Sequence, residues 1–497
     1  MTAARPARPA RPAARRAAGP AARRAAGRAD PVELGVLEAA AALRARRISS
    51  LELTDACLAR IGSRNGGPPS FDGAPGAVNA WARLYPDEAR AEARAADRRL
   101  AAQGDDAPLL CGIPLAVKDL YSVAGRPLTA SSRVLDDDPV PADAVVVARL
   151  REDGMVVLGH THTHEFAAGG TTDQVGNPFD LSLVAGGSSG GSAAALAARM
   201  VPAALGTDTC GSLRVPSAFC GTSTIKPTHG RVSLDGIVPL APSLDHPGPM
   251  ARTVADAAAL LSVMATVPET SALMPPPAPL GPLALRPSAA GRPLEGRTVA
   301  LGEPQPDLPW DAAVVAGFET AHRALVALGA RVVAAPSWPL EWDHLNAVLL
   351  TEMWSYHSRF APRRDRYRPA IAELVEAAAA FDDGGAYFSA QLARSRAAGA
   401  YDAWFAANGV DLLCEPTLAV LPPPRGEGYA RGHAGGVGDP LIALSARWDM
   451  TGMPVVSLPV AWNVGVSLVA PRGREALAVQ AGIDLQEHAL GLPAWPE

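Results

Sequence analysis

The stretch that decides the fold is "DAVVVARLREDGMVVLGHTHTHEF", residues 143–166. Its first half has the apolar spacing of a helix, and the apolar run that follows is typical of a buried strand. Upstream, "CGIPLAVKDLYSV" (111–123) contains a short β-rich run, which predicts a buried strand ending at Lys118 and Asp119. Helices and strands that alternate in this way predict an α/β fold around a mostly parallel sheet.

Similar segments continue on both sides. Apolar residues spaced three and four apart predict helices in four places: residues 30–64, with Asp30 as the N-cap before Pro31, residues 87–103, a segment from about Asp311, and residues 340–410. A Pro-rich connection covers residues 265–295, and the last segment returns to strands. Because no internal repeat is present, we expect one large domain over residues 30–492.

The composition is that of a folded enzyme-sized protein, with 48% hydrophobic and 19% charged residues among 497. No run approaches the roughly 18 consecutive apolar residues that a membrane helix needs. The five cysteines are scattered and odd in number, which indicates neither a disulfide framework nor a metal knuckle. These features predict a protein of the reducing cytoplasm with no membrane partner.

Residues 1–29 differ from the remainder, because they hold eight arginines and no acidic residue. Their Arg-Pro-Ala repetition has no apolar periodicity and predicts a disordered tail, with a nucleic-acid or anionic-surface arm as the alternative. A net charge of −5 for the chain leaves −13 for the other residues (−5 minus 8). That acidic balance argues against nucleic acid as the main partner.

Glycine and serine are concentrated in "VAGGSSGGSAAALAARM", residues 184–200. A phosphate cradle is excluded as a P-loop because no Gly-Lys-Ser/Thr closes the stretch. A flexible turn and a loop that fixes an active-site serine remain. Two residues support the loop that fixes an active-site serine. Ser212 lies in another Gly/Ser turn, and burial of Lys118 at a strand end would lower its pKa. A lysine base, a bridging Ser188 and a hydroxyl nucleophile could then form a relay.

Several long motifs, in order, resemble the amidase signature family of Ser-cisSer-Lys amidohydrolases. They include "GGSSGGSAAALAA", "GTDTCGSLRVPSAFCG", "IKPTHGRVS" and "SLDHPGPMARTVADAA", with "CGIPLAVKDL" before them and "WDMTGMPVVSLPV" after them. The similarity covers roughly residues 30–490 and is weakest across 270–400. It implies one large domain with a mixed, mostly parallel, twisted sheet covered by helices on both faces. It also places a divergent substrate-specificity region at about 300–420.

The resemblance also implies the site. The family's lysine base falls on Lys118, its bridging serine with a cis peptide bond on Ser188, and its nucleophile on Ser212. The oxyanion hole would be formed by backbone N–H groups of Thr209, Cys210, Gly211 and Ser212, and supporting roles fall to Ser189, Asp208 and Arg214. The mechanism would form an acyl-enzyme and need neither metal nor cofactor.

Two positions depart from the family pattern. Cys210 stands where the family usually has glycine; a positive φ there would cost about 1–2 kcal/mol and tilt an oxyanion donor, whereas a negative φ would leave the thiol narrowing the acyl pocket. Cys210 as the nucleophile is disfavoured because Ser212 keeps the relay spacing. Thr224 also replaces a usual glycine and could tighten the pocket.

Other polar and aromatic residues are expected to be mainly structural. His160, His162 and His164 would share one face of a strand and could bind metal adventitiously, but a structural or substrate-edge role is favoured. Adjacent residues cannot easily serve one another in a triad, which favours structure for Asp245 and His246. In the divergent region, core packing is somewhat favoured over a pocket wall for Trp354, Tyr356 and His357.

The favoured function is a stand-alone hydrolase of a small-molecule carboxylic amide or a related C–N bond, with no nucleic-acid partner and a homodimer as one candidate assembly. The alternatives are the glutaminase, or ammonia-supplying, subunit of a tRNA-dependent amidotransferase, and a catalytically impaired homologue. The amide itself cannot be identified from these motifs.

Overall fold

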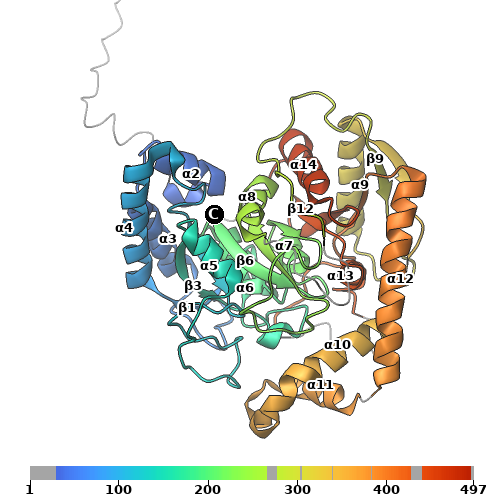
Figure 1. Ribbon diagram of the computed structural model, residues 1–497, viewed down its shortest axis with the longest axis horizontal. Coiled ribbons are helices and arrows are strands. Elements are labelled where there is room, and N and C mark those ends of the chain that lie inside the picture. The colour runs from blue at the N-terminus through green and yellow to red at the C-terminus, as the bar shows by residue number, and fades with distance from the viewer. Residues whose placement is uncertain are drawn as a thin grey trace, which may run out of the picture.

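The computed structural model describes residues 30–265, 277–302, 305–338, 340–381, 383–426 and 439–493. The predicted tail (1–29) and part of the Pro-rich connection lie outside these ranges. Figure 1 shows the arrangement of the helices and strands.

An eleven-stranded mixed sheet runs through the described part of the chain. In spatial order its strands are β1 (Trp81–Leu84), β3 (Val156–Thr161), β2 (Pro114–Lys118), β6 (Ala203–Asp208), β8 (His246–Ala251), β7 (Ser223–Lys226), β12 (Val455–Ala461), β13 (Val464–Val469), β11 (Leu412–Pro416), β9 (Thr298–Leu301) and β10 (Arg331–Ala334). Parallel pairs join β3, β2 and β6 near one end and β11, β9 and β10 at the other, while antiparallel pairs cross the middle. The predicted α/β class with a mixed sheet is confirmed.

A small second sheet pairs β4 (Gly176–Asn177) with β5 (Asp180–Val184). The helices are α2 (Val36–Arg44), α3 (Ser50–Arg64), α4 (Pro86–Gln103), α5 (Val145–Glu152), α6 (Gly190–Ala197), α7 (Arg214–Phe219), α8 (Val254–Met264), α9 (Ala312–Ala327), α10 (Trp342–His357), α11 (Pro369–Ala380), α12 (Gly384–Asn408), α13 (Ala446–Met450) and α14 (Glu475–Leu485).

The local predictions follow from simple causes. The stretch 143–166 forms α5 and then β3, as its change of periodicity indicates. Every residue of β2 is buried, because β3 and β6 pair with it on both sides. Its apolar run ends at Lys118, the last residue of the strand. Asp311 caps α9, since its carboxylate accepts a hydrogen bond from the Ala313 N–H.

Helices cover the sheet in groups. In Figure 1, α2, α3 and α4 lie at the left, α9 and α12 at the right, and α10 and α11 extend below. Within the sheet-covering layers, α8 packs against α14, and α6 packs against α7. No helix in the described ranges is both long and apolar enough to cross a membrane.

Candidate active site

Lys118 lies at the carboxyl end of β2, with its side chain fully buried. Its Nζ is 2.8 Å from each of three hydroxyl oxygens, those of Ser188, Ser189 and Thr207. Burial lowers the pKa of Lys118 from 10.5 to about 7, because a charged ammonium loses its hydration there. The amine is therefore available as a base near neutral pH.

The hydrogen bonds around Nζ restrict which hydroxyl donates to it. A neutral amine has two N–H donors and one lone pair, so one of the three oxygens must supply a proton to that lone pair. The Ser189 hydroxyl donates to the Thr207 carbonyl at 3.1 Å, so it accepts from Lys118. Only Ser188 or Thr207 can then donate to the lysine lone pair.

The glycine-rich loop brings Ser188 to the lysine through very close backbone contacts. A Cβ at Gly187 would lie 2.2 Å from the Thr171 carbonyl oxygen, so no larger residue fits there. The peptide bond between Gly187 and Ser188 is cis. The next N–H, that of Ser189, donates to the Ser212 carbonyl at 3.3 Å. The loop and the turn that carries Ser212 are thus joined directly.

Residues 208–212, here called the 208–212 turn, are shaped by one carboxylate. Asp208 accepts hydrogen bonds from the N–H of Gly211 at 2.5 Å and from the N–H of Leu213 at 3.1 Å. Gly211 has a φ of 136°, which favours glycine, and Ser212 is 7% exposed. Because the Gly211 N–H is directed at Asp208, the N–H groups of Thr209, Cys210 and Ser212 are the better candidates for an oxyanion hole.

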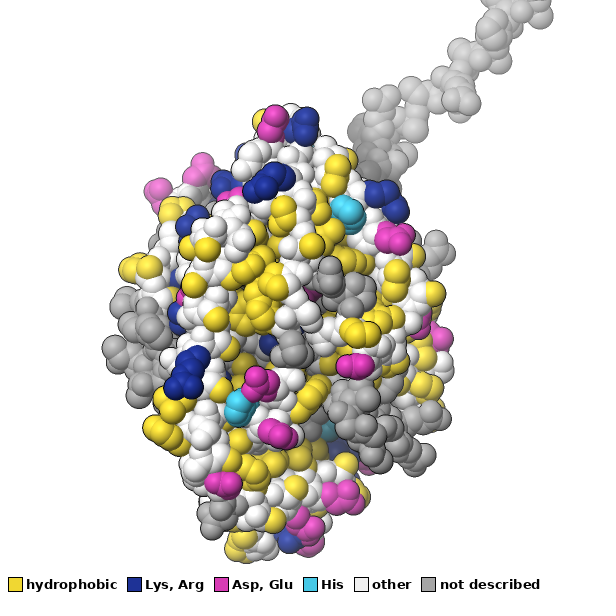
Figure 2. Space-filling model, turned by 90° about the vertical axis from the view of Figure 1, so that its right-hand side faces the viewer, with side chains coloured by type: hydrophobic (Ala, Val, Ile, Leu, Met, Phe, Trp, Pro, Cys, Tyr) yellow, Lys and Arg dark blue, Asp and Glu magenta, His cyan; other side chains and the backbone are white. Residues whose placement is uncertain are grey.

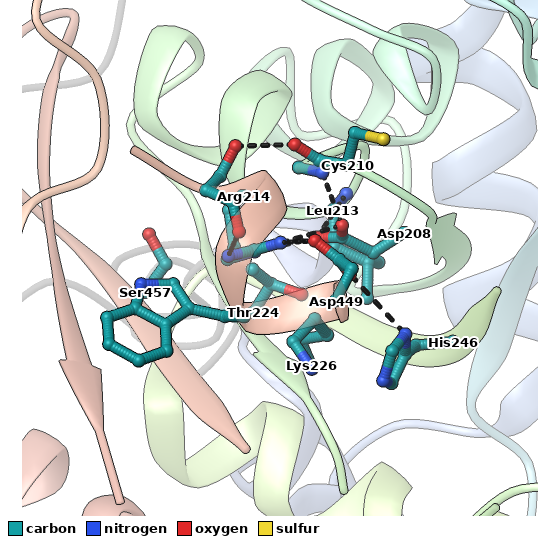
Figure 3. A network of polar contacts seen from close by, with 12 residues as sticks. Asp208, Cys210, Leu213, Arg214, Thr224, Lys226, His246, Asp449 and Ser457 are labelled. Atoms are coloured by element: carbon teal, nitrogen blue, oxygen red, sulfur yellow. Dashed lines mark hydrogen bonds and ion pairs between the residues drawn. The ribbon is translucent and has the colours of Figure 1, made fainter. Parts of the chain in front are cut away.

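Asp208 belongs to a buried ionic network that spans distant parts of the chain (Figure 3). Arg214 contacts both oxygens of Asp208, at 2.8 and 2.9 Å, and an oxygen of Asp449 at 2.5 Å. Burial alone would raise the pKa of Asp208, but the charge and hydrogen bonds of Arg214 outweigh it and hold the pKa below its usual range. Burial raises the pKa of Asp449 well above its usual value, although the charge of Arg214 acts in the opposite sense.

Cys210 does not carry the backbone cost expected for a positive φ, because its φ lies outside the left-handed region. Its side chain is 8% exposed and packs in an apolar cluster with Leu244, Val348 and Met450. Burial raises the pKa of the thiol well above its usual value, which opposes thiolate formation. The structure therefore places this side chain among core residues and makes it a poor nucleophile.

Thr224 is fully buried on β7, where its hydroxyl donates to the Pro249 carbonyl of β8 at 2.8 Å. This bond links two antiparallel strands of the sheet. The side chain therefore has a structural partner, whereas a role in tightening the acyl pocket was the expectation from sequence.

The three alternating histidines diverge rather than sharing one face. Only His160 lies on β3; its ring contacts the Tyr85 hydroxyl at 2.7 Å and the Tyr121 carbonyl at 3.0 Å. His162 contacts Ser131 and Ser70, and His164 contacts the Thr171 carbonyl. No group of three or more metal-ligating side chains occurs within the described ranges.

Asp245 and His246 contact different partners. Asp245 accepts a 2.6 Å hydrogen bond from the Thr209 hydroxyl, beside the 208–212 turn, and His246 lies 3.4 Å from Asp449. In the divergent region, His357 contacts the Tyr367 hydroxyl at 2.7 Å and packs edge-on against Phe166. Tyr356 belongs to the same aromatic group, and Trp354 packs against the main core, as core residues would.

Three residues of this site were missed from the sequence: Thr207, Ser445 and Asp449. The strand pattern could have found Thr207, because parallel pairing of β2 with β6 brings the strand ends together. Ser445 donates a 2.5 Å hydrogen bond to the Cys210 carbonyl, but it lies far along the chain and follows no periodic pattern. Asp449 lies within a quoted motif, yet nothing in that motif indicates its pairing with Arg214.

The similarity to known proteins agrees with this geometry. A family model described as Amidase matches residues 71–479. The chain belongs to the amidase family. Its fold is that of amidase signature enzymes.

Similar proteins come from two groups. One subunit of the glutamyl-tRNA(Gln) amidotransferase of Anaeromyxobacter sp. is 48% identical over 237 residues, covering 47% of this chain and 46% of that protein. The subunit of the same name from Ralstonia nicotianae is 41% identical over 348 residues, 66% of this chain and 67% of that protein. Peptide amidase from Stenotrophomonas maltophilia is 28% identical with a TM-score of 0.77, covering 94% and 99%.

The chain spans about half the length of the first curated relatives it matches. These relatives overturn the expectation that nucleic acid is excluded as a partner. Their names assign them to an enzyme that acts on glutamyl-tRNA, and they match this chain at 41–49% identity. Net charge alone was too weak a ground for that exclusion, because a chain with an acidic total can still resemble proteins named for a reaction on tRNA.

Proposed function

We propose that this chain cleaves a carboxamide C–N bond through an acyl-enzyme on Ser212. The observation that carries the proposal is Lys118 Nζ, 2.8 Å from the Ser188 hydroxyl, in a setting that lowers the lysine pKa to about 7. Neutral Lys118 takes the Ser188 proton while Ser188 takes the Ser212 proton. Ser212 Oγ then bonds to the amide carbon.

The reaction continues by returning the proton. The negative carbonyl oxygen accepts hydrogen bonds from N–H groups of Thr209, Cys210 and Ser212. Protonated Lys118 gives its proton, through Ser188, to the departing nitrogen, which leaves as ammonia or an amine. Water then attacks the ester by the same route, releasing the acid and restoring Ser212.

For the substrate, we favour the side-chain amide of glutamine, with the ammonia supplied to a tRNA-dependent amidotransferase. The support is the similarity to subunits of such enzymes, which reaches 41% identity over 348 residues. A stand-alone amidase is the second candidate. It is favoured by the likeness to peptide amidase, which extends over 94% of this chain rather than 66% of it.

Ammonia release from glutamine and from a panel of other primary amides tests the choice between the two. Ammonia from glutamine, lost in Ser212→Ala and retained in Cys210→Ala, supports the amidotransferase role. Ammonia from other amides with none from glutamine supports the stand-alone enzyme. A folded wild-type chain that releases none from any amide, and that no fluorophosphonate labels at Ser212, contradicts both.

A further inference from the structure

Ser243, in the turn before β8, is held by two helices of the divergent region. Its N–H and hydroxyl both donate to the Glu352 carboxylate on α10, at 2.9 and 2.5 Å. Its hydroxyl and carbonyl oxygens accept hydrogen bonds from Arg394 on α12, at 2.7 and 2.6 Å. Glu352 is 8% exposed and Arg394 is 2% exposed, so these bonds form away from water. We call this group the Ser243 clasp.

The turn that the clasp holds is bonded to the 208–212 turn. Asp245 accepts hydrogen bonds from the N–H groups of Leu240 and Ala241, at 3.0 and 3.2 Å, which fixes its carboxylate within the same turn. The other carboxylate oxygen of Asp245 accepts a hydrogen bond from the Thr209 hydroxyl at 2.6 Å. The turn that contains Ser243 is therefore linked through Asp245 to Thr209.

Contacts of Cys210 and Arg394 reinforce this connection. The Cys210 side chain packs with Val348 of α10 and Ala390 of α12. Arg394 Nε also donates to the Met450 carbonyl at 2.9 Å, and Met450 belongs to the same apolar cluster. Two successive residues of the 208–212 turn are thus linked to the helices, one by polar and one by apolar contacts.

The packing of α12 is incomplete beside the Ser243 clasp. A cavity of about 240 Å³ borders Arg394, Tyr401 and Met450. On its outer side α12 exposes Phe388 and Leu392, which are 64% and 42% exposed. Figure 2 views this side of the molecule and shows hydrophobic side chains gathered over the middle of that face. The Ser243 clasp therefore adds polar contacts to α12 at a place where its packing is open.

A buried ionic cluster is weak evidence for stability, since its desolvation cost offsets much of its attraction. Its geometry is specific, however, and it joins two helices of the divergent region to the turn that carries Ser212. Resting on the function proposed above, we infer that Glu352 and Arg394 are positioning residues. Through Ser243, Asp245 and Thr209 they set the direction of the oxyanion N–H groups.

The test uses the rate constant for labelling of Ser212 by a fluorophosphonate, which needs no natural substrate. Thr209→Val removes the hydroxyl and keeps the shape, and Glu352→Gln weakens the clasp without changing its size. We expect each to lower the rate constant of labelling by the fluorophosphonate about 10-fold. Thr209→Ser keeps the hydroxyl and should restore most of the rate.

The double variant Thr209→Val with Glu352→Gln decides whether the two act on one path. A shared path predicts a loss near 10-fold, whereas independent effects predict about 100-fold. Asp402→Asn is the matched control: it loosens another anchor of α12, to Arg472 at 2.9 Å, and leaves the clasp intact. It should label at the wild-type rate, with melting temperatures recorded for every variant.

Three outcomes overturn the inference: additive losses in the double variant, wild-type rates in folded single variants, or an equal loss in Asp402→Asn. In a folded variant, Arg394→Lys gives a second measure, because lysine cannot reproduce the guanidinium contacts to Ser243 and Met450. An unlabelled wild-type chain would instead contradict the function proposed above. The two failures are therefore distinguishable.

Discussion

We predict that the rate of Ser212 acylation depends on pH because Lys118 is buried. The lysine pKa falls from 10.5 to about 7, mainly through desolvation, with Asp208 and Asp245 acting in the opposite sense. A shift of this size corresponds to about 5 kcal/mol against the charged amine. At pH 7 about half of the folded molecules carry a neutral lysine, compared with roughly one in 3,000 for an unshifted lysine.

Fluorophosphonate labelling measured from pH 5 to pH 9 tests this value. Only the neutral amine can accept the proton, so the rate constant should rise about tenfold per pH unit up to about pH 7 and then level off. At pH 5 it should be about 100-fold below the plateau. Peptide mapping assigns the label to Ser212, and Lys118→Ala should remove the pH-dependent part of the rate.

A flat profile would refute the reasoning, since it would mean that no titrating base takes part. A profile that still rises steeply at pH 9 would refute the burial argument, because it would place the lysine near its ordinary pKa. The reagent's own hydrolysis is measured at every pH and subtracted, so that its reactivity with hydroxide is not mistaken for that of the enzyme.

The remaining predictions concern stability and the departures from the family pattern. Lys118→Met should raise the melting temperature at pH 7 while abolishing labelling, because the cost of keeping the lysine neutral, about 5 kcal/mol, exceeds three hydrogen bonds of about 1 kcal/mol each. The wild-type chain itself should gain stability as pH rises from about 7 to 10.5, since the unfolded chain binds the extra proton there; this is read from melting curves of wild type against Lys118→Met. Cys210→Gly should cost about 1–2 kcal/mol in unfolding free energy through lost burial and added backbone freedom, with labelling within threefold of wild type; a larger change would mean that the thiol shapes the acyl pocket. Arg214→Met should destabilise the chain by about 3–5 kcal/mol in denaturant unfolding, because Asp208 is left buried without its partner.

Segments with a strong periodic pattern were predictable. The helix and strand of residues 143–166 formed as expected because the apolar spacing changes within the stretch. Lys118 was expected at a strand end for an equally local reason, since a charge there ends an apolar run. Asp30 as an N-cap needed only its place before Pro31, and its side chain accepts a hydrogen bond from the Val32 N–H.

Pairings between distant polar residues were not predictable. Arg214 and Asp449 are separated by more than 200 residues, and neither lies in a periodic pattern that would align them. The same holds for Ser243, whose partners come from two helices of the most divergent region. The backbone of Cys210 could not be determined either, because a single side chain does not fix its own φ. Its φ lies outside the left-handed region, which removes the backbone cost expected for a positive φ.

One physical requirement links these features. Burial away from water lowers the pKa of Lys118, but it also raises the free energy of an ionised carboxylate nearby that has no partner. The negative charge of Asp208 acts in the opposite sense on Lys118 and favours its protonated form. Arg214 compensates for both effects. Its contacts with Asp208 at 2.8 and 2.9 Å keep that carboxylate ionised, and its positive charge offsets the negative field of Asp208 at Lys118. The Asp208 carboxylate can then accept the backbone hydrogen bonds that shape the 208–212 turn. The buried arginine thus lets one environment provide both an uncharged base and a turn built around a charged side chain.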